Sequence, residues 1–491
     1  MEKSLTDWIQ RALVSSKGIW KVLAILALCL LVGTLGGAIL AYLSLPYTAA
    51  LIVALVGGAL LLRDTQWGMI ALVGVICLLP FAAVPLDLGF EPTFLDLVLL
   101  ALLFVLASRI ANRRQGPLVT TPLALPILFF LVIVVVAMLA GLGHSSLNTT
   151  LIRRFAELLL GVFTFFIVVN CVQSQKQLDL VVRVLILAGF AAALIGIVLY
   201  FMPENLAIRL LSALRVVRYP AGSGVLRYVE DDTTLPLRAI STSQDPNVLG
   251  GLLILVTGLS IPQIVSRRPL LPRKLMLPIV GCMLLCLYLT YSRGAMAGLA
   301  AGVAAISVFR YRRLGWLLIV GVALILILPQ TQAYVQRFIE GVHGEDLATQ
   351  MRFGEYSDAF KVIMLHPWLG VGFSGTPEID LYLGVSSLYL LIGEEAGLVG
   401  LGSFLLIIVL FWVQFWRSRS LALQDEHLDA IFWGIGCALF GGLVAGVLDH
   451  YFFNLAFPHA VTIFWTYVAL GMVTISLLQR KGALGEQPTR G

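Results

Sequence analysis

Apolar runs and short polar breaks alternate along almost the whole chain. A helix that crosses a bilayer needs about 20 mostly apolar residues. On this criterion the sequence predicts about 14 membrane-spanning helices, and three short runs widen the count to 12–14. The predicted spans are residues 22–43, 47–62, 67–84, 94–110, 123–142, 154–172, 178–202, 246–265, 275–291, 294–309, 314–328, 387–416, 430–448 and 457–478.

This pattern predicts an all-α, polytopic helical membrane protein with a single transmembrane domain, residues 22–478. A polar and basic segment, residues 1–21, precedes this domain, and a short tail, residues 479–491, follows it. Two polar stretches are much longer than the others, residues 203–245 and 329–386. No small-residue cleavage site closes the first apolar run, so we expect no cleaved signal peptide.

Composition supports the membrane assignment, since 59% of the residues are hydrophobic and only 12% are charged. Soluble domains carry about 25% charged residues. The net charge of +6 would suggest a nucleic-acid partner in a soluble protein. Here the enrichment of Lys and Arg in cytoplasmic loops explains it, and we expect no nucleic acid.

The same rule orients the chain. With a cytoplasmic N-terminus, 21 of the 33 Lys and Arg lie in cytoplasmic segments and 11 in extracytoplasmic ones. The bias predicts that both termini are cytoplasmic and that both long loops face the exterior.

The extracytoplasmic cations are nearly all arginine. Lys361 is the exception, and the arginines are Arg153, Arg154, Arg209, Arg215, Arg218, Arg227, Arg238, Arg293, Arg337 and Arg352. The guanidinium fork matches phosphate oxygens in a way that lysine does not. For any single arginine, a salt bridge to a nearby acid such as Glu230, Asp231 or Glu355 is the better interpretation. For the set, an anionic ligand that bears phosphate is an equal alternative.

Arg293 lies between two apolar runs with almost no loop around it. A guanidinium keeps its charge and is costly in hydrocarbon. Arg293 therefore requires a partner, which is a lipid headgroup, a carboxylate or a bound anionic substrate.

Six cysteines fall in or beside apolar runs. Cys282 and Cys286 share a helical face, but no second pair of ligands accompanies them. We expect them to pack in the interior, and we expect neither disulfides nor a metal site.

Two loop motifs have structural explanations. Residues 370–375 match G-x-G-x-x-G, but a dinucleotide site requires a strand before the motif and a βαβ unit, neither of which fits here. Asp245 or Ser243 is expected to cap the helix that begins at Pro246. Arg238 lies just upstream, where a helix N-terminus also favours anions.

Four residues are candidates for acid/base chemistry: Glu394, Glu395, His450 and His343. The paired carboxylates lie near a span end, where burial raises a carboxyl pKa toward neutrality. They are equally plausible as counter-ions of Arg293 or Arg352. A single histidine at a membrane boundary is more often structural than catalytic.

Several motifs within residues 235–415 occur in a known order and spacing. They are Arg238 before Asp245-Pro246-Asn247; Ser292-Arg293-Gly294-Ala295; Arg352 before a Pro-x-x-Gly-x-Gly turn at 367–372; and Leu388-Tyr389-Leu390 before Glu395, Gly397, Leu398 and Gly400. Together they resemble the O-antigen ligase/polymerase superfamily of bacterial membrane glycosyltransferases. The first seven spans match only in being apolar.

The resemblance implies a membrane-embedded glycosyltransferase of the bacterial cytoplasmic (inner) membrane. Its donor would be an undecaprenyl-diphosphate-linked glycan, and its acceptor a glycan or a lipid-linked molecule. Arginines matching Arg238 and Arg293 would hold the donor diphosphate. We add Arg352 to this set as our own hypothesis. No nucleotide sugar, metal ion or other cofactor would be needed.

One position departs from the family pattern. Ligases of this family typically carry His-Asn just before Leu-Tyr-Leu, and the histidine is proposed to activate the acceptor hydroxyl. This chain has Ser386-Ser387 there. A serine is a poor general base near neutral pH, so one of the four candidates replaces it or the acceptor differs.

We therefore predict polymerisation or transfer of a lipid-linked glycan at the outer face of the membrane, with inversion of the anomeric carbon. The enzymatic alternative is a ligase that moves the glycan to a lipid A core or another lipid or protein acceptor. The alternative from another class is a transporter or flippase of an anionic lipid-linked solute. Transporters place charges near mid-membrane and show repeats, whereas the charges here lie at outer span ends.

Overall fold

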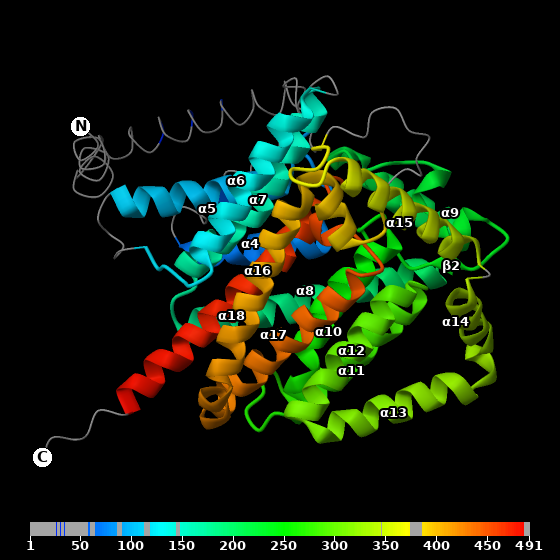
Figure 1. Ribbon diagram of the computed structural model, residues 1–491. Helices are drawn as coiled ribbons and strands as arrows, with labels where there is room; N and C mark the ends of the chain where they lie inside the picture. Colours follow the sequence, from blue (N-terminus) through cyan, green and yellow to red (C-terminus); the bar gives the residue numbers. More distant parts are fainter. Residues whose placement is uncertain are drawn as a thin grey trace, which may run out of the picture. The chain divides into compact units, whose positions relative to one another are not determined.

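The computed structural model describes residues 64–85, 91–111, 118–143, 148–344, 346–373 and 385–485, with isolated positions at 26, 30, 34, 57 and 58. The chain divides into two units, Met1–Arg63 and Asp64–Gly491. The second unit contains all the helices and strands labelled in Figure 1. The predicted spans at 22–43 and 47–62 lie outside the described residues.

Each of the other twelve predicted spans coincides with a helix. These helices are α4 (Thr65–Leu78), α5 (Phe94–Ala111), α6 (Ala124–Gly141), α7 (Thr149–Cys171), α8 (Gln175–Phe201), α10 (Pro246–Val265), α11 (Arg273–Leu289), α12 (Arg293–Phe309), α13 (Arg312–Ile327), α16 (Leu388–Gln424), α17 (Glu426–Ala445) and α18 (Pro458–Gly485). In lipid, a helix satisfies every backbone polar group internally, which is why apolar runs of this length fold this way. The protein is an all-α polytopic membrane protein.

The exact number of spans stays a prediction. Among the described residues, seven helices are long and apolar enough to cross a membrane: α5, α6, α8, α10, α16, α17 and α18. Helix α4 ends at Leu78, six residues before the predicted end. Pro80 follows closely, and the residue before a proline disfavours helical geometry.

Both long loops contain ordered elements. Residues 203–245 contain α9 (Glu204–Ala213) and an antiparallel pair of short strands, β1 (Arg227–Tyr228) and β2 (Leu237–Arg238), in which Arg227 faces Arg238. Residues 329–386 contain α14 (Gln332–His343) and α15 (Leu347–Leu365). Short 3-10 turns complete the described chain at Leu214–Val217, Ser223–Val225, Val229–Asp231, Pro329–Thr331 and Tyr451–Phe453.

Helices α10, α12 and α17 pack on one another and form the centre of this unit (Figure 1). Small residues make the packing close. A Cβ atom at Gly298 or Gly302 of α12 would overlap the backbone of α17, and one at Gly258 of α10 would overlap Ala438. Helix–helix contacts in membranes favour such small residues because the backbones can then approach. We call these three closely packed helices the central bundle. Charged groups lie at both of its ends.

Helix α16 is broken at Gly397, whose φ of 68° is left-handed. The turn at residues 367–372 packs into this break. Val371 and Gly372 donate backbone hydrogen bonds to the carbonyls of Glu394 and Glu395, at 2.9 and 3.1 Å. A Cβ at Gly370 would overlap the backbone at residues 394–397. Residues 367–372 thus form a turn against a broken helix.

Candidate functional site

A pocket of about 190 Å³ lies where α10 and α12 begin, and we call it the arginine pocket. It brings together Arg238, Arg293 and Arg352, which belong to three different elements. Its lining residues are Tyr228, Val229, Glu230, Asp231, Arg238, Asn247, Tyr291, Ser292, Arg293, Tyr334 and Arg352. The three arginines that the sequence proposed as diphosphate ligands therefore share one cavity.

Arg293 is the first residue of α12. The chain reverses direction just before it, and Tyr291 adopts a left-handed φ of 53° in this reversal. The Arg293 Nη2 lies 2.5 Å from Oδ2 of Asp346, whose side chain is only 6% exposed. The carboxylate partner of Arg293 is therefore Asp346 at the start of α15, and the described structure shows no ion pair with Glu394 or Glu395.

This ion pair shifts the titration of Asp346. Burial alone raises the pKa of this carboxyl, but hydrogen bonds from Arg293 and Thr349 and the charge of Arg293 together outweigh burial, so the net pKa is lowered. A methyl group at Gly341 of α14 would overlap the Arg293 guanidinium. The second long loop thus both neutralises Arg293 and fixes its position.

Arg238 is held by two contacts. Its Nε donates to the carbonyl of Thr290 at 2.8 Å, and its Nη2 donates to Oδ1 of Asn247 at 2.7 Å. Asn247 is the second residue of α10, and Asp245 caps that helix as predicted, accepting from the backbone N–H groups of Asn247 and Val248. The spacing between the arginine and the Pro-Asn helix start therefore has a physical basis, because Asn247 orients Arg238.

Arg352 projects from α15 and is half-buried. It forms no hydrogen bond or ion pair with any other residue that the structure describes. Its charge lies in the pocket, where electrostatic interactions link it to Tyr356 and Asp449. Of the three arginines, Arg352 has the least compensated charge within the described chain.

Sequence reasoning did not identify the aromatic wall of the pocket. The rings of Tyr288 and Tyr291 pack with that of Tyr334, with centroids 5.3–6.3 Å apart. The Tyr334 hydroxyl contacts the sulfur of Met296 at 2.8 Å. Tyr291 directly precedes the Ser-Arg-Gly-Ala motif, and this position in the sequence was the signal that could have placed a tyrosine at the site.

Two acids also line the pocket. Glu230 and Asp231 are exposed and adopt left-handed φ values of 57° and 55° in succession. Non-glycine residues rarely take this conformation, and strained backbone concentrates at functional sites. The sequence identified these acids only as possible salt-bridge partners.

Residues 278–405 match the family model described as O-antigen ligase. The match covers part of the chain. The matched segment contains Arg293, Arg352, the 367–372 turn and Glu395, so it confirms the resemblance to the O-antigen ligase/polymerase superfamily. No curated protein matches the chain.

The match and the apolar helices together support an integral inner-membrane protein with an activity of the O-antigen ligase or polymerase type. The family implies lipid-linked glycans as substrates. Arg238 lies outside the matched segment, and its place in the site rests on the geometry of the pocket.

None of the four acid/base candidates lines the arginine pocket. Glu394 and Glu395 lie at the break of α16, and each has one buried carboxylate oxygen without a hydrogen-bond partner among the described residues. His343 is exposed at the end of α14, with Nδ1 2.8 Å from the carbonyl of Ile339. Their catalytic roles stay predictions.

His450 follows a residue that contacts the segment where a family histidine is expected. The carbonyl of its neighbour Asp449 accepts a backbone hydrogen bond from Leu388, which directly follows Ser386-Ser387. His450 Nδ1 is 3.6 Å from Oδ1 of Asp449. Burial raises the pKa of Asp449, and electrostatic interactions connect this carboxyl to Arg352 and Asp245. Asp449 thus contacts the first residue of α16, directly after the serine segment.

Proposed function

We propose that this protein polymerises an undecaprenyl-diphosphate-linked glycan at the outer face of the inner membrane. The observation that carries the proposal is the convergence of Arg238, Arg293 and Arg352 on one pocket. In the predicted topology this pocket faces the exterior. Three guanidinium groups match a diphosphate in both charge and hydrogen-bond geometry.

The arginines would act on the leaving group. As the bond between the anomeric carbon and the phosphate oxygen breaks, its electron pair moves to the diphosphate, and the pocket stabilises the added charge. The acceptor hydroxyl loses its proton to a base and forms the new bond to the anomeric carbon. Displacement in a single step inverts that carbon.

We propose His450 as the base. This choice is based on the contact of its neighbour Asp449 with the residue directly after Ser386-Ser387 and on the electrostatic link between Asp449 and Arg352. Glu394, Glu395 and His343 stay secondary candidates. If His450→Gln retains wild-type turnover while Asp231→Asn loses it, the general base is instead an acidic residue that lines the pocket.

The second long loop would cover the donor. It supplies Tyr334, Arg352 and the partner of Arg293, Asp346. A cover over the diphosphate excludes water, which would otherwise hydrolyse the donor.

The deciding measurement is glycan transfer from a purified lipid-linked donor. We expect Arg293→Ala and Arg352→Ala each to lower turnover by about 100-fold or more, the size seen when a transition-state donor is removed. The matched control is Arg209→Ala, an exposed arginine of the first long loop that does not line the pocket. Arg352→Ala is the cleaner variant because it leaves no described partner unpaired, and wild-type turnover in that variant would overturn the assignment.

Three further readouts separate the alternatives. A ladder of products on the lipid carrier supports polymerisation, whereas a single transfer to a lipid or protein acceptor supports the ligase. Movement of donor across liposomes without a new glycosidic bond supports a transporter. Since guanidinium groups would neutralise the diphosphate, we also propose that EDTA leaves turnover unchanged.

A further inference from the structure

A cavity of about 720 Å³ lies at the other end of the central bundle, and we call it the distal cavity. Arg267 follows the end of α10, Arg310 follows the end of α12, and Glu426 begins α17, and all three line this cavity. Helix α12 has 17 residues, so its ends are about 25 Å apart. The distal cavity is therefore separate from the arginine pocket.

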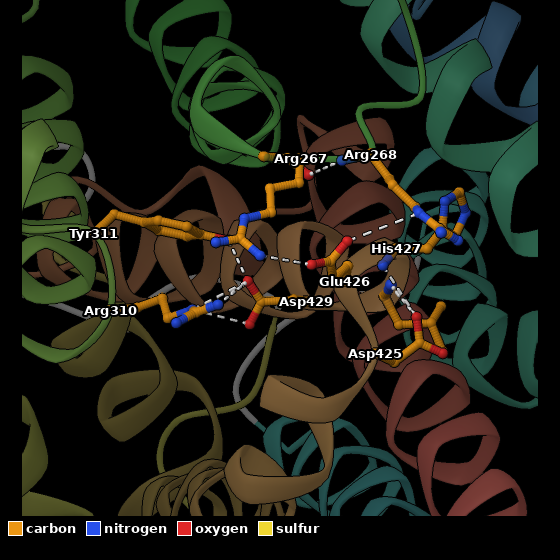
Figure 2. Close-up of polar contacts among 10 residues, drawn as sticks. Arg267, Arg268, Arg310, Tyr311, Asp425, Glu426, His427 and Asp429 are labelled. Carbon is orange, nitrogen blue, oxygen red and sulfur yellow. Dashed lines mark hydrogen bonds and ion pairs between the residues drawn. The ribbon is translucent and has the colours of Figure 1, made fainter.

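The acids of the distal cavity are already paired. Figure 2 shows Arg310 and Tyr311 meeting at Asp429, while Arg267 reaches Glu426. The Arg310 Nε lies 3.1 Å from both carboxylate oxygens of Asp429, and the Arg267–Glu426 hydrogen bond is 2.9 Å long.

Positive charge remains beyond these pairs. Arg312 and Arg313 line the cavity, are exposed, and form no hydrogen bond or ion pair with another residue in the described part of the chain. They are the first two residues of α13. The N-terminal end of a helix dipole is also positive, so the two cations add to the positive potential there. The distal cavity therefore favours an added anion.

An apolar groove of about 230 Å³ adjoins the cavity and shares Phe309 with it. Aromatic rings from α12, α16 and α17 line the groove, and Phe309 packs edge-on against Trp416 at 4.7 Å. Trp433 also lines it and is only 4% exposed.

We propose that the distal cavity and this groove together bind one phospholipid with an anionic headgroup. Arg312 and Arg313 contact the phosphate, and one acyl chain occupies the groove. Basic pockets between membrane helices bind such headgroups on the cytoplasmic side, which is the side that the topology predicts for this cavity. The groove distinguishes a lipid from a small anion, and the surplus charge distinguishes an anionic lipid from a zwitterionic one.

The test uses the purified full chain in detergent. Native mass spectrometry and thermal unfolding are followed during titration with phosphatidylglycerol, phosphatidylcholine of the same chain length, and inorganic phosphate. The test variant is Arg312→Gln with Arg313→Gln. The matched control is Lys274→Gln with Arg417→Gln, which removes two exposed cations that do not line the cavity.

We expect phosphatidylglycerol to bind wild type and the control at least about tenfold more tightly than phosphatidylcholine, and we expect the test variant to lose this preference. Ala305→Trp fills the groove and should weaken the lipid without changing phosphate binding, which keeps the proposal testable if the arginine variant does not fold. Equal binding of the two lipids, or unchanged phosphatidylglycerol binding in the test variant, overturns the proposal. Displacement of the lipid by an equal concentration of phosphate also overturns it, because the site would then bind a small anion.

Discussion

Arg293 and Arg310 lie at the two ends of α12, and their surroundings differ in one instructive way. Arg310 follows the C-terminus of the helix, where the dipole favours a cation, and Asp429 binds it through both oxygens. Arg293 begins the helix, where the dipole opposes a cation. Its carboxylate partner comes from a distant loop, and Arg238 and Arg352 bring further positive charge into the same pocket.

The difference concerns how each arginine is held. Arg310 is bound by one carboxylate of the neighbouring helix, so its chief effect is on the packing of α12 against α17. The arginine pocket brings three guanidinium groups together at the start of a helix, where the dipole opposes them, although Glu230 and Asp231 also line it. The two ends of one helix thus separate a structural arginine from one that we propose to be functional.

The same conservative substitution at each end tests this comparison most strongly. Lysine keeps the charge but loses the guanidinium fork. We expect Arg293→Lys to lower glycan transfer by about 100-fold to 1000-fold, and Arg310→Lys to change it by less than about twofold. The measurement is the rate of glycan transfer from a lipid-linked donor by each variant. Comparable losses of rate in both variants would show that the two arginines do not differ in function.

The position of the Arg293 guanidinium is testable without changing any charge. Gly341→Ala places a methyl group where that guanidinium lies. A displacement of about 1 Å in a reacting site can lower a rate by up to about 100-fold. The control is Gly281→Ala, because no atom lies within 4 Å of a Cβ at that glycine. Equal turnover in the two variants would mean that Arg293 tolerates displacement.

The Arg293–Asp346 pair also predicts a pH dependence of stability. The folded-state pKa of Asp346 is lowered from its ordinary 3.8. A carboxyl of this kind stabilises the fold above its unfolded pKa and loses that contribution as pH falls through its folded pKa. The thermal midpoint of wild type should therefore fall more steeply below pH 3.8 than that of Asp346→Asn. Parallel curves for the two proteins would contradict this contribution.

The smallest effect is expected at the surface of the distal cavity. Arg267 is 82% exposed and Glu426 is 46% exposed, so solvent screens their attraction. We expect Arg267→Ala to change the free energy of unfolding by no more than about 0.5 kcal/mol. Reversible unfolding in detergent measures this change, and a larger loss would show that the exposed pair stabilises the bundle.

Local patterns predicted the fold well. Apolar length placed α5, α10 and α12 within two residues of their observed ends, because a helix is the one open-chain structure that satisfies its own backbone in lipid. The cap at Asp245 was expected from residue type and spacing. The early end of α4 was not, because hydropathy alone continued the run past Pro80.

The site was predicted only in part. The family resemblance named Arg238 and Arg293, our own hypothesis added Arg352, and the structure places all three in one pocket. Asp346 and Tyr334 were not predicted, since they lie in a polar loop whose docking onto α12 has no signal in local pattern. The sequence offered Glu394 and Glu395 as counter-ions, but the described structure pairs Arg293 with Asp346 instead.

The sequence by itself determined an all-α membrane protein with arginine concentrated in its predicted outer segments, since hydropathy and residue type act locally along the chain. Only the tertiary structure decided which carboxylate neutralises Arg293, which amide orients Arg238, and which cations stay without a described partner. A guanidinium can pair with any acceptor within reach. The packing of helices far apart in the sequence determines which acceptors those are.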